Sequence, residues 1–138
     1  MSIHHLHNMN HWAVLASAAM LWLLGAVWYS PLLFAKPWMA ELSIVPGGRK
    51  ERLVIGMISS FFGDLLVAFV LLHIILWSGA SSFGTGAFVG SISWLGFLAA
   101  TQFPQGVYDN RPVKLFAINT AYWFLGLLII GGVLAVWR

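Results

Sequence analysis

A single carboxylate lies at the centre of an apolar segment that is long enough to cross a lipid bilayer. Asp64 is the only acidic residue between positions 53 and 77, and the same segment has no Lys and no Arg. A charged carboxylate in the middle of a bilayer costs about 2.5 to 3.5 kcal/mol on insertion scales, so such residues are usually protonated, paired or used. The chemistry that Asp64 offers is proton or cation binding, and the alternative is a neutral acid that hydrogen-bonds between helices.

Helical rise places four hydrogen-bonding side chains at a depth close to that of Asp64. Trp22 and Trp94 share its depth, and Tyr122 lies about one turn nearer the cytoplasmic side. Ser60 is four residues before Asp64 and therefore lies on the same helix face. Since none of these is a cation, we expect an intramembrane polar centre in which Asp64 is protonated, accepts hydrogen bonds from these donors, or meets a neighbouring subunit.

Histidines are the other candidate ligands, because the chain has no Cys. Imidazole is the commonest ligand for zinc and copper, and His7 and His11 would share a face of a helical tail. Their spacing matches no defined metal site, which favours structural histidines over a metal site, and His73 is an alternative ligand for a pigment macrocycle. The candidate metal ligands are His4, His5, His7, His11 and His73, and the sequence identifies no cofactor.

The composition indicates an integral membrane protein. Of the 138 residues, 60% are hydrophobic and only 8% are charged, which lies outside the range of soluble domains. We expect an all-α polytopic protein of four transmembrane helices with short loops. The expected parts are a His-rich extracytoplasmic tail at 1–11 and one transmembrane domain at 12–138, with spans at about 12–34, 53–77, 84–103 and 115–137.

The loop after the first span contains a short segment that has two interpretations. Residues 37–45 begin with Pro37 and are followed by Pro46-Gly47-Gly48. Proline in the first turn and glycine after the last are typical of a helix, and the apolar residues between them would suit the membrane surface. The alternative is an irregular surface loop.

Basic residues predict the orientation of the four helices. Of the seven Lys and Arg residues, all but Arg138 lie in the loops after the first and third spans. By the positive-inside rule these two loops face the cytoplasm, so both termini lie on the outer side of the cytoplasmic (inner) membrane. The loop residues are Lys36, Arg49, Lys50 and Arg52 in the first loop, and Arg111 and Lys114 in the second.

Small residues mark helix faces that can pack closely. Gly86 and Gly90 form a GxxxG pair, which by itself is a weak signal for dimerisation. Gly131 and Gly132 in the fourth span either serve packing or loosen the outer end of that helix.

Two motifs flank the expected cytoplasmic ends of the spans. The first starts with Trp28-Tyr29-Ser30-Pro31 and continues to Trp38, and the second includes Tyr108-Asp109-Asn110-Arg111-Pro112. In both motifs the chain resembles the DUF1761 family of small bacterial four-helix membrane proteins of unknown function, which has Glu where Asp109 stands. The resemblance implies an inner-membrane helical bundle and no particular activity.

Both motifs are expected at the same membrane surface, where their side chains can meet in a cytoplasmic-face motif. A structural turn is the favoured interpretation, and a pocket for a lipid headgroup or small anion is the alternative. An ion pair between Arg111 and Asp109 or Glu41 would contribute at most about 1 kcal/mol. The motif residues are Tyr29, Lys36, Trp38, Tyr108, Arg111 and Asn119.

These features favour a protein without catalytic activity. The sequence has no nucleophile elbow, phosphate-binding loop or HExxH motif, and its scattered basic residues make no nucleic-acid-binding face. The first hypothesis is a homo-oligomer, or a subunit of a larger membrane complex, in the lipid bilayer. The alternatives are a small proton or cation channel or transporter that uses Asp64, and a pigment- or metal-bearing accessory subunit of a redox or light-harvesting complex.

Overall fold

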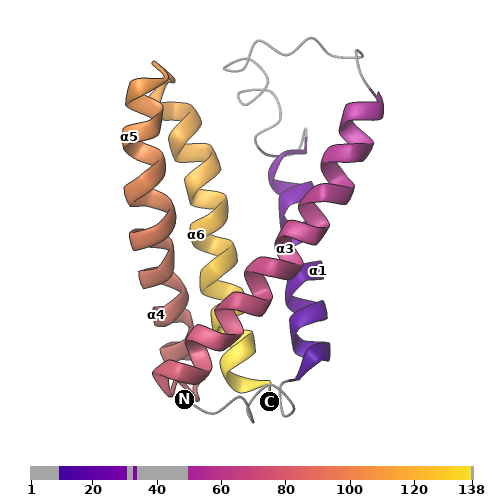
Figure 1. Cartoon of the computed structure of the whole chain (residues 1–138), viewed down its shortest axis with the longest axis vertical. Coiled ribbons are helices and arrows are strands. Elements are labelled where there is room, and N and C mark those ends of the chain that lie inside the picture. The colour runs from indigo at the N-terminus through magenta and orange to yellow at the C-terminus, as the bar shows by residue number, and fades with distance from the viewer. Residues whose placement is uncertain (1–9, 31–32, 34–49, 138) are drawn as a thin grey trace.

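Four membrane-length helices make up the described part of the chain (Figure 1). The computed structural model describes residues 10–30, 33 and 50–137. The all-α class with four candidate spans is confirmed. In chain order the helices are α1 (His11–Trp28), α3 (Lys50–Ser78), the continuous third span of α4 (Phe83–Ser93), η2 (Trp94–Ala99) and α5 (Ala100–Tyr108), and α6 (Val113–Val136).

The helices run alternately up and down, so alternate connections lie at the same end of the bundle (Figure 1). The end of α1, the start of α3 and the turn between α5 and α6 lie at the upper end in Figure 1, which we call the basic-loop end. The turn at 79–82 lies at the opposite end, together with the start of α1 and the end of α6. The two basic loops therefore leave the same end of the bundle, while the membrane side that this end faces stays a prediction.

The first span is shorter than the expected 12–34. Helix α1 ends at Trp28, and the backbone N–H of Tyr29 caps it by bonding the carbonyl of Gly25. The physical reason is Pro31, because the residue before a proline is disfavoured in the helical conformation. The proposed interfacial helix at 37–45 lies outside the described residues.

The third span is longer than the expected 84–103, because Pro104 does not end it. The helix continues to Tyr108, and the six residues before Ala100 form a turn of π-helix. Membrane helices tolerate an internal proline when local π turns and neighbouring helices satisfy the backbone groups that it frees. The wide turn directly before Ala100 is such an adjustment.

Glycines bring α4 and α6 into backbone contact. A Cβ atom built on Gly86 would overlap the carbonyl oxygen of Gly131, and one built on Gly90 would overlap that of Leu127. A Cβ on Gly132 would likewise meet the ring of Phe83. The GxxxG pair therefore forms an internal crossing, so its interpretation as a dimerisation surface is wrong for this face.

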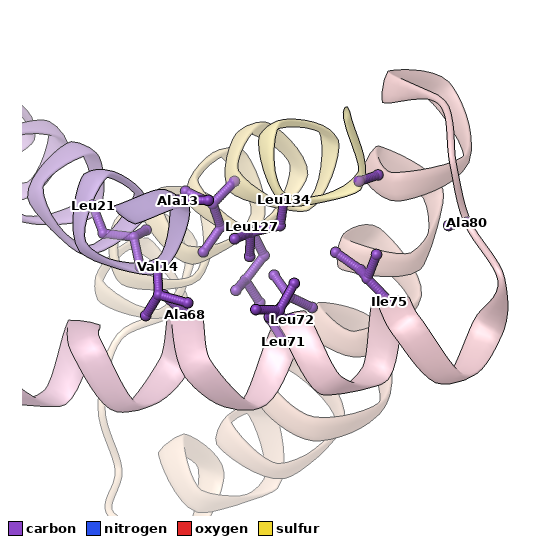
Figure 2. Packing of buried hydrophobic residues seen from close by; sticks show 12 residues of the cluster. Ala13, Val14, Leu21, Ala68, Leu71, Leu72, Ile75, Ala80, Leu127 and Leu134 are labelled. Carbon is purple, nitrogen blue, oxygen red and sulfur yellow. The ribbon is translucent and has the colours of Figure 1, made fainter. Parts of the chain in front are cut away.

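An apolar cluster fills the bundle between Asp64 and the opposite end. Figure 2 shows its side chains from α1, α3 and α6 pointing toward one another. In contrast, residues 54–60 of α3 are exposed throughout. The buried members of the cluster are Ala13, Val14, Leu21, Ala68, Leu71, Leu72, Ile75, Ala80, Leu127, Ile130, Leu134 and Ala135.

Candidate functional site

Asp64 lies inside the bundle, as the sequence predicts. Its side chain is only 3% exposed, and no hydrogen bond or ion pair joins its carboxyl group to another described residue. Ser17 on α1 and Thr120 on α6 are the other buried polar residues in the described ranges, and their hydroxyl groups have no partner there either. The carboxyl group is therefore not interhelical glue within this part of the chain.

Two of the expected donors bond elsewhere, to a single carbonyl of α3. The indole nitrogen of Trp22 donates to the carbonyl oxygen of Met57 at 3.0 Å, and the Ser60 hydroxyl donates to the same oxygen at 3.0 Å. Trp22 also packs edge-on against Phe61 with ring centroids 6.2 Å apart. Ser60 is exposed although it lies one turn from buried Asp64. These contacts tie α1 to α3 at the exposed half of α3.

The other two expected donors also bond backbone carbonyls. The Trp94 indole nitrogen donates to the carbonyl oxygen of Thr120 at 2.9 Å, and the Tyr122 hydroxyl donates to that of Leu21 at 2.8 Å. Of the alternatives that the sequence leaves open for Asp64, hydrogen bonds from these four side chains are therefore not formed. A helical carbonyl keeps a second lone pair after its backbone bond, so each indole or phenol finds an acceptor on the facing helix.

A polar track leads from Asp64 toward the basic-loop end, through Tyr122, Tyr29 and Asn119. Tyr122 lies near enough to Asp64 to be affected by a charge on it, and the Tyr122 and Tyr29 rings meet edge-on with centroids 5.8 Å apart. The Tyr29 hydroxyl donates to Oδ1 of Asn119 at 2.6 Å. Burial raises the pKa of the Tyr29 hydroxyl to about 12, so this group stays a protonated donor at neutral pH.

The track ends in a small pocket between α5 and α6. Its volume is about 120 Å³, and Asn119 is one of its walls. Two Gln side chains and one guanidinium group line it together with apolar residues, so the pocket can hold water or a small polar group. The lining residues are Gln102, Gln105, Gly106, Arg111, Leu115, Phe116 and Asn119.

The structure joins only part of the cytoplasmic-face motif. Tyr29 and Asn119 are hydrogen-bonded, and Arg111 lines the same pocket as Asn119. Tyr108 points away and is 87% exposed. Arg111 lies 3.8 Å from a carboxylate oxygen of Asp109 in an exposed pair, which is the ordinary surface bridge that the sequence suggests. Lys36 and Trp38 lie outside the described residues.

Comparison with known proteins places the chain in a family. A family model described as "Protein of unknown function (DUF1761)" matches residues 12–135. The chain belongs to the DUF1761 family. The match includes all four spans and the whole polar track, and it confirms the resemblance seen in the two motifs. No curated protein and no solved structure matches the chain.

The described histidines of this DUF1761 member do not form a metal site. Nδ1 of His73 lies 2.8 Å from the carbonyl oxygen of Phe69 on its own helix, and the ring packs between Phe69 and Trp77. His11 is exposed at the start of α1. In the described ranges no three His, Asp or Glu side chains come together. His4, His5 and His7 lie outside those ranges.

Three residues that shape the DUF1761 site were not singled out from the sequence. The Trp28 indole nitrogen donates to the carbonyl oxygen of Ile118 at 3.0 Å, which fixes the end of α1 against α6. A Cβ atom on Gly25 would lie 3.2 Å from the Tyr122 hydroxyl, so this glycine accommodates the Tyr122 ring. Ser17 is fully buried. The only signals for them were the first motif and the small residues of the first span.

Proposed function

We propose that this DUF1761 member is a non-catalytic, proton-responsive membrane protein in which Asp64 gains and loses a proton from the basic-loop end. The observation that carries the proposal is a buried carboxyl group with a polar track on one side and, on the other, the apolar cluster, beside which Ser17 is a buried polar side chain. A carboxyl group at membrane depth is a functional candidate when it has access to water and no fixed counter-ion. The polar track supplies that access.

The apolar side of Asp64 argues against a pathway through the whole bundle. Asp64, Ala68, Leu71 and Ile75 are spaced by three or four residues and are all buried. Eleven residues of helix separate Asp64 from Ile75, which corresponds to about 16 Å of apolar packing. An ion that reached Asp64 would have to cross this layer, so the geometry supports proton binding rather than conduction within one chain.

Ionisation of Asp64 would compete for the donor that now joins α6 to α1. The Tyr122 hydroxyl of the polar track now bonds the carbonyl of Leu21. A charged acceptor forms a stronger hydrogen bond than a neutral carbonyl does, so loss of the proton favours rotation of this hydroxyl toward Asp64. The α1–α6 contact would then loosen, which couples protonation to the packing of the bundle.

Few other titratable groups face this site. In the described part of the helices packed against α3, α4 has none, α1 has His11 at the opposite end, and α6 has Lys114 and Tyr122. On α3 itself, His73 is nine residues from Asp64. Among these groups, Tyr122 is near enough to be affected by a charge on Asp64.

The experiment is a one-sided pH jump on oriented proteoliposomes, followed by tryptophan fluorescence. We expect a fluorescence change when the jump is applied at the basic-loop end, and its loss in Asp64→Asn. Asp109→Asn is the matched control, since this acid is exposed on the turn after α5 and its removal should leave the response unchanged. An unaltered response in Asp64→Asn, or an equal response from the opposite end, would contradict the proposal. A sustained proton flux that Asp64→Asn abolishes would replace it with the channel alternative.

A second candidate function is that of a subunit in an oligomer or larger complex. It is favoured by α3, whose residues 54–60 are exposed apart from the contact between Met57 and Trp22. Because the chain has no Cys, Ile58→Cys can report contact between copies by disulfide formation in native membranes. Ile92→Cys on exposed α4 is the control. Equal cross-linking at both positions would remove this reason to favour an oligomer.

A further inference from the structure

An apolar groove runs along the outer surface of the bundle between the third span and α6. Its volume is about 520 Å³, which is in the size range of small-molecule sites. Small side chains form its floor, and its walls are almost entirely apolar. The lining residues are Trp94, Leu95, Ala99, Ala100, Phe103, Phe116, Ala117, Thr120, Ala121 and Phe124.

Aromatic pairs mark the two ends of this groove. Trp94 and Phe124 pack with ring centroids 4.8 Å apart, and Phe103 and Phe116 with centroids 5.3 Å apart. From Phe116 to Phe124 the helical rise is about 12 Å. A membrane helix would need a contact face along much of a span of about 30 Å, whereas a single hydrocarbon chain fits a short groove between two aromatic pairs.

Positive charge lies just beyond the end of the groove that is nearer the basic-loop end. Lys114 is exposed and precedes Ala117 and Ala121 at helical spacing, so it lies on the same face of α6 as the groove. It is two residues, about 3 Å of helical rise, beyond Phe116. Arg111 is also exposed in the turn before α6, and its bridge to Asp109 is long. Basic residues at this depth attract anionic lipid headgroups.

We propose that this groove binds one acyl chain of an anionic phospholipid, whose phosphate group contacts Lys114 and Arg111. Groove and charge together suit an amphipathic ligand with a hydrocarbon chain and an acidic head. The proposal does not depend on Asp64, because the groove lies on the outer surface; of the residues it uses, only Phe116 and Arg111 also line the pocket at the end of the polar track.

The experiment uses the full chain in detergent, delipidated and then titrated with phosphatidylglycerol or phosphatidylcholine, with bound lipid counted by native mass spectrometry. We expect preferential retention of phosphatidylglycerol. Lys114→Gln should lower that retention about fivefold and leave phosphatidylcholine unchanged. Ala121→Phe should fill the groove and abolish retention of both lipids. The matched control is Ala26→Phe, an exposed position of α1 outside the groove.

Equal lipid retention in Ala121→Phe and Ala26→Phe would overturn the proposed site. Loss of retention in Ala121→Phe without any effect of Lys114→Gln would overturn the choice of an anionic lipid. If Ala121→Phe instead converted a dimer to a monomer while lipid retention stayed unchanged, the occupant would be a second copy of the chain, and the proposal would be wrong.

Discussion

Replacing Gly90 by alanine should destabilise the bundle through a single methyl group. A Cβ atom at this position overlaps the carbonyl oxygen of Leu127. Backbone atoms cannot move aside as a flexible side chain can, so the α4–α6 crossing must open. Overpacking costs about 1 to 3 kcal/mol, and the rigid obstacle places Gly90→Ala near the upper value, about 3 kcal/mol.

Gly63→Ala provides the matched control for this change. Gly63 lies inside α3, and a Cβ atom there meets nothing within 4 Å. Alanine is favoured over glycine within helices by about 0.5 to 1 kcal/mol. Because both variants receive this propensity gain, it cancels, and the difference between them is the cost of the overlap alone.

The assay is reversible unfolding in mixed micelles titrated with a denaturing detergent, followed by circular dichroism. We expect Gly90→Ala to unfold at a lower denaturing-detergent fraction than wild type, and Gly63→Ala at an equal or higher one. Equal stabilities of the two variants would refute the internal crossing. Loss of a dimer in Gly90→Ala with unchanged monomer stability would restore the interpretation of Gly86 and Gly90 as a surface for a second copy.

Three further predictions concern an interhelical hydrogen bond, the membrane orientation and a surface ion pair. Tyr122→Phe should lower the free energy of unfolding by about 0.6 to 1.7 kcal/mol in the same assay, the range for interhelical hydrogen bonds in membranes, whereas Tyr108→Phe at an exposed site should have no effect. Ser81→Cys should react with a membrane-impermeant thiol reagent in intact cells, and Val107→Cys should react only after permeabilisation; the reverse pattern would overturn the predicted orientation. Arg111→Gln should change the unfolding free energy by less than about 1 kcal/mol, because its ion pair is exposed, and a larger loss would indicate a buried role.

The sequence alone determined the membrane architecture of this protein. The hydropathy of a segment is a sum over about 20 neighbouring residues, so the four spans can be located without any knowledge of how the helices pack. The depth of Asp64 in the membrane was predictable for a related reason, since the middle of a long apolar helix is distant from water at both ends. The two motifs were sufficient to identify the family.

Helix ends were less predictable, because they depend on single residues. Pro31 ends α1 six residues before the expected boundary, whereas Pro104 lies inside the third span. The second proline follows a π turn by about one helical turn, and membrane helices tolerate prolines where such local adjustments and neighbouring helices satisfy the backbone. Hydropathy contains no information about such local adjustments.

Only the tertiary structure decided the partners of each polar group. Depth estimates placed Trp22, Trp94 and Tyr122 near Asp64, but a hydrogen bond also requires the correct helix rotation and separation, and all three side chains donate to backbone carbonyls instead. Rotation likewise turned Gly86 and Gly90 inward against α6. The arrangement of a polar track on one side of Asp64 and an apolar cluster on the other arises from contacts among α1, α3 and α6, which lie far apart in the sequence and meet only when the helices pack.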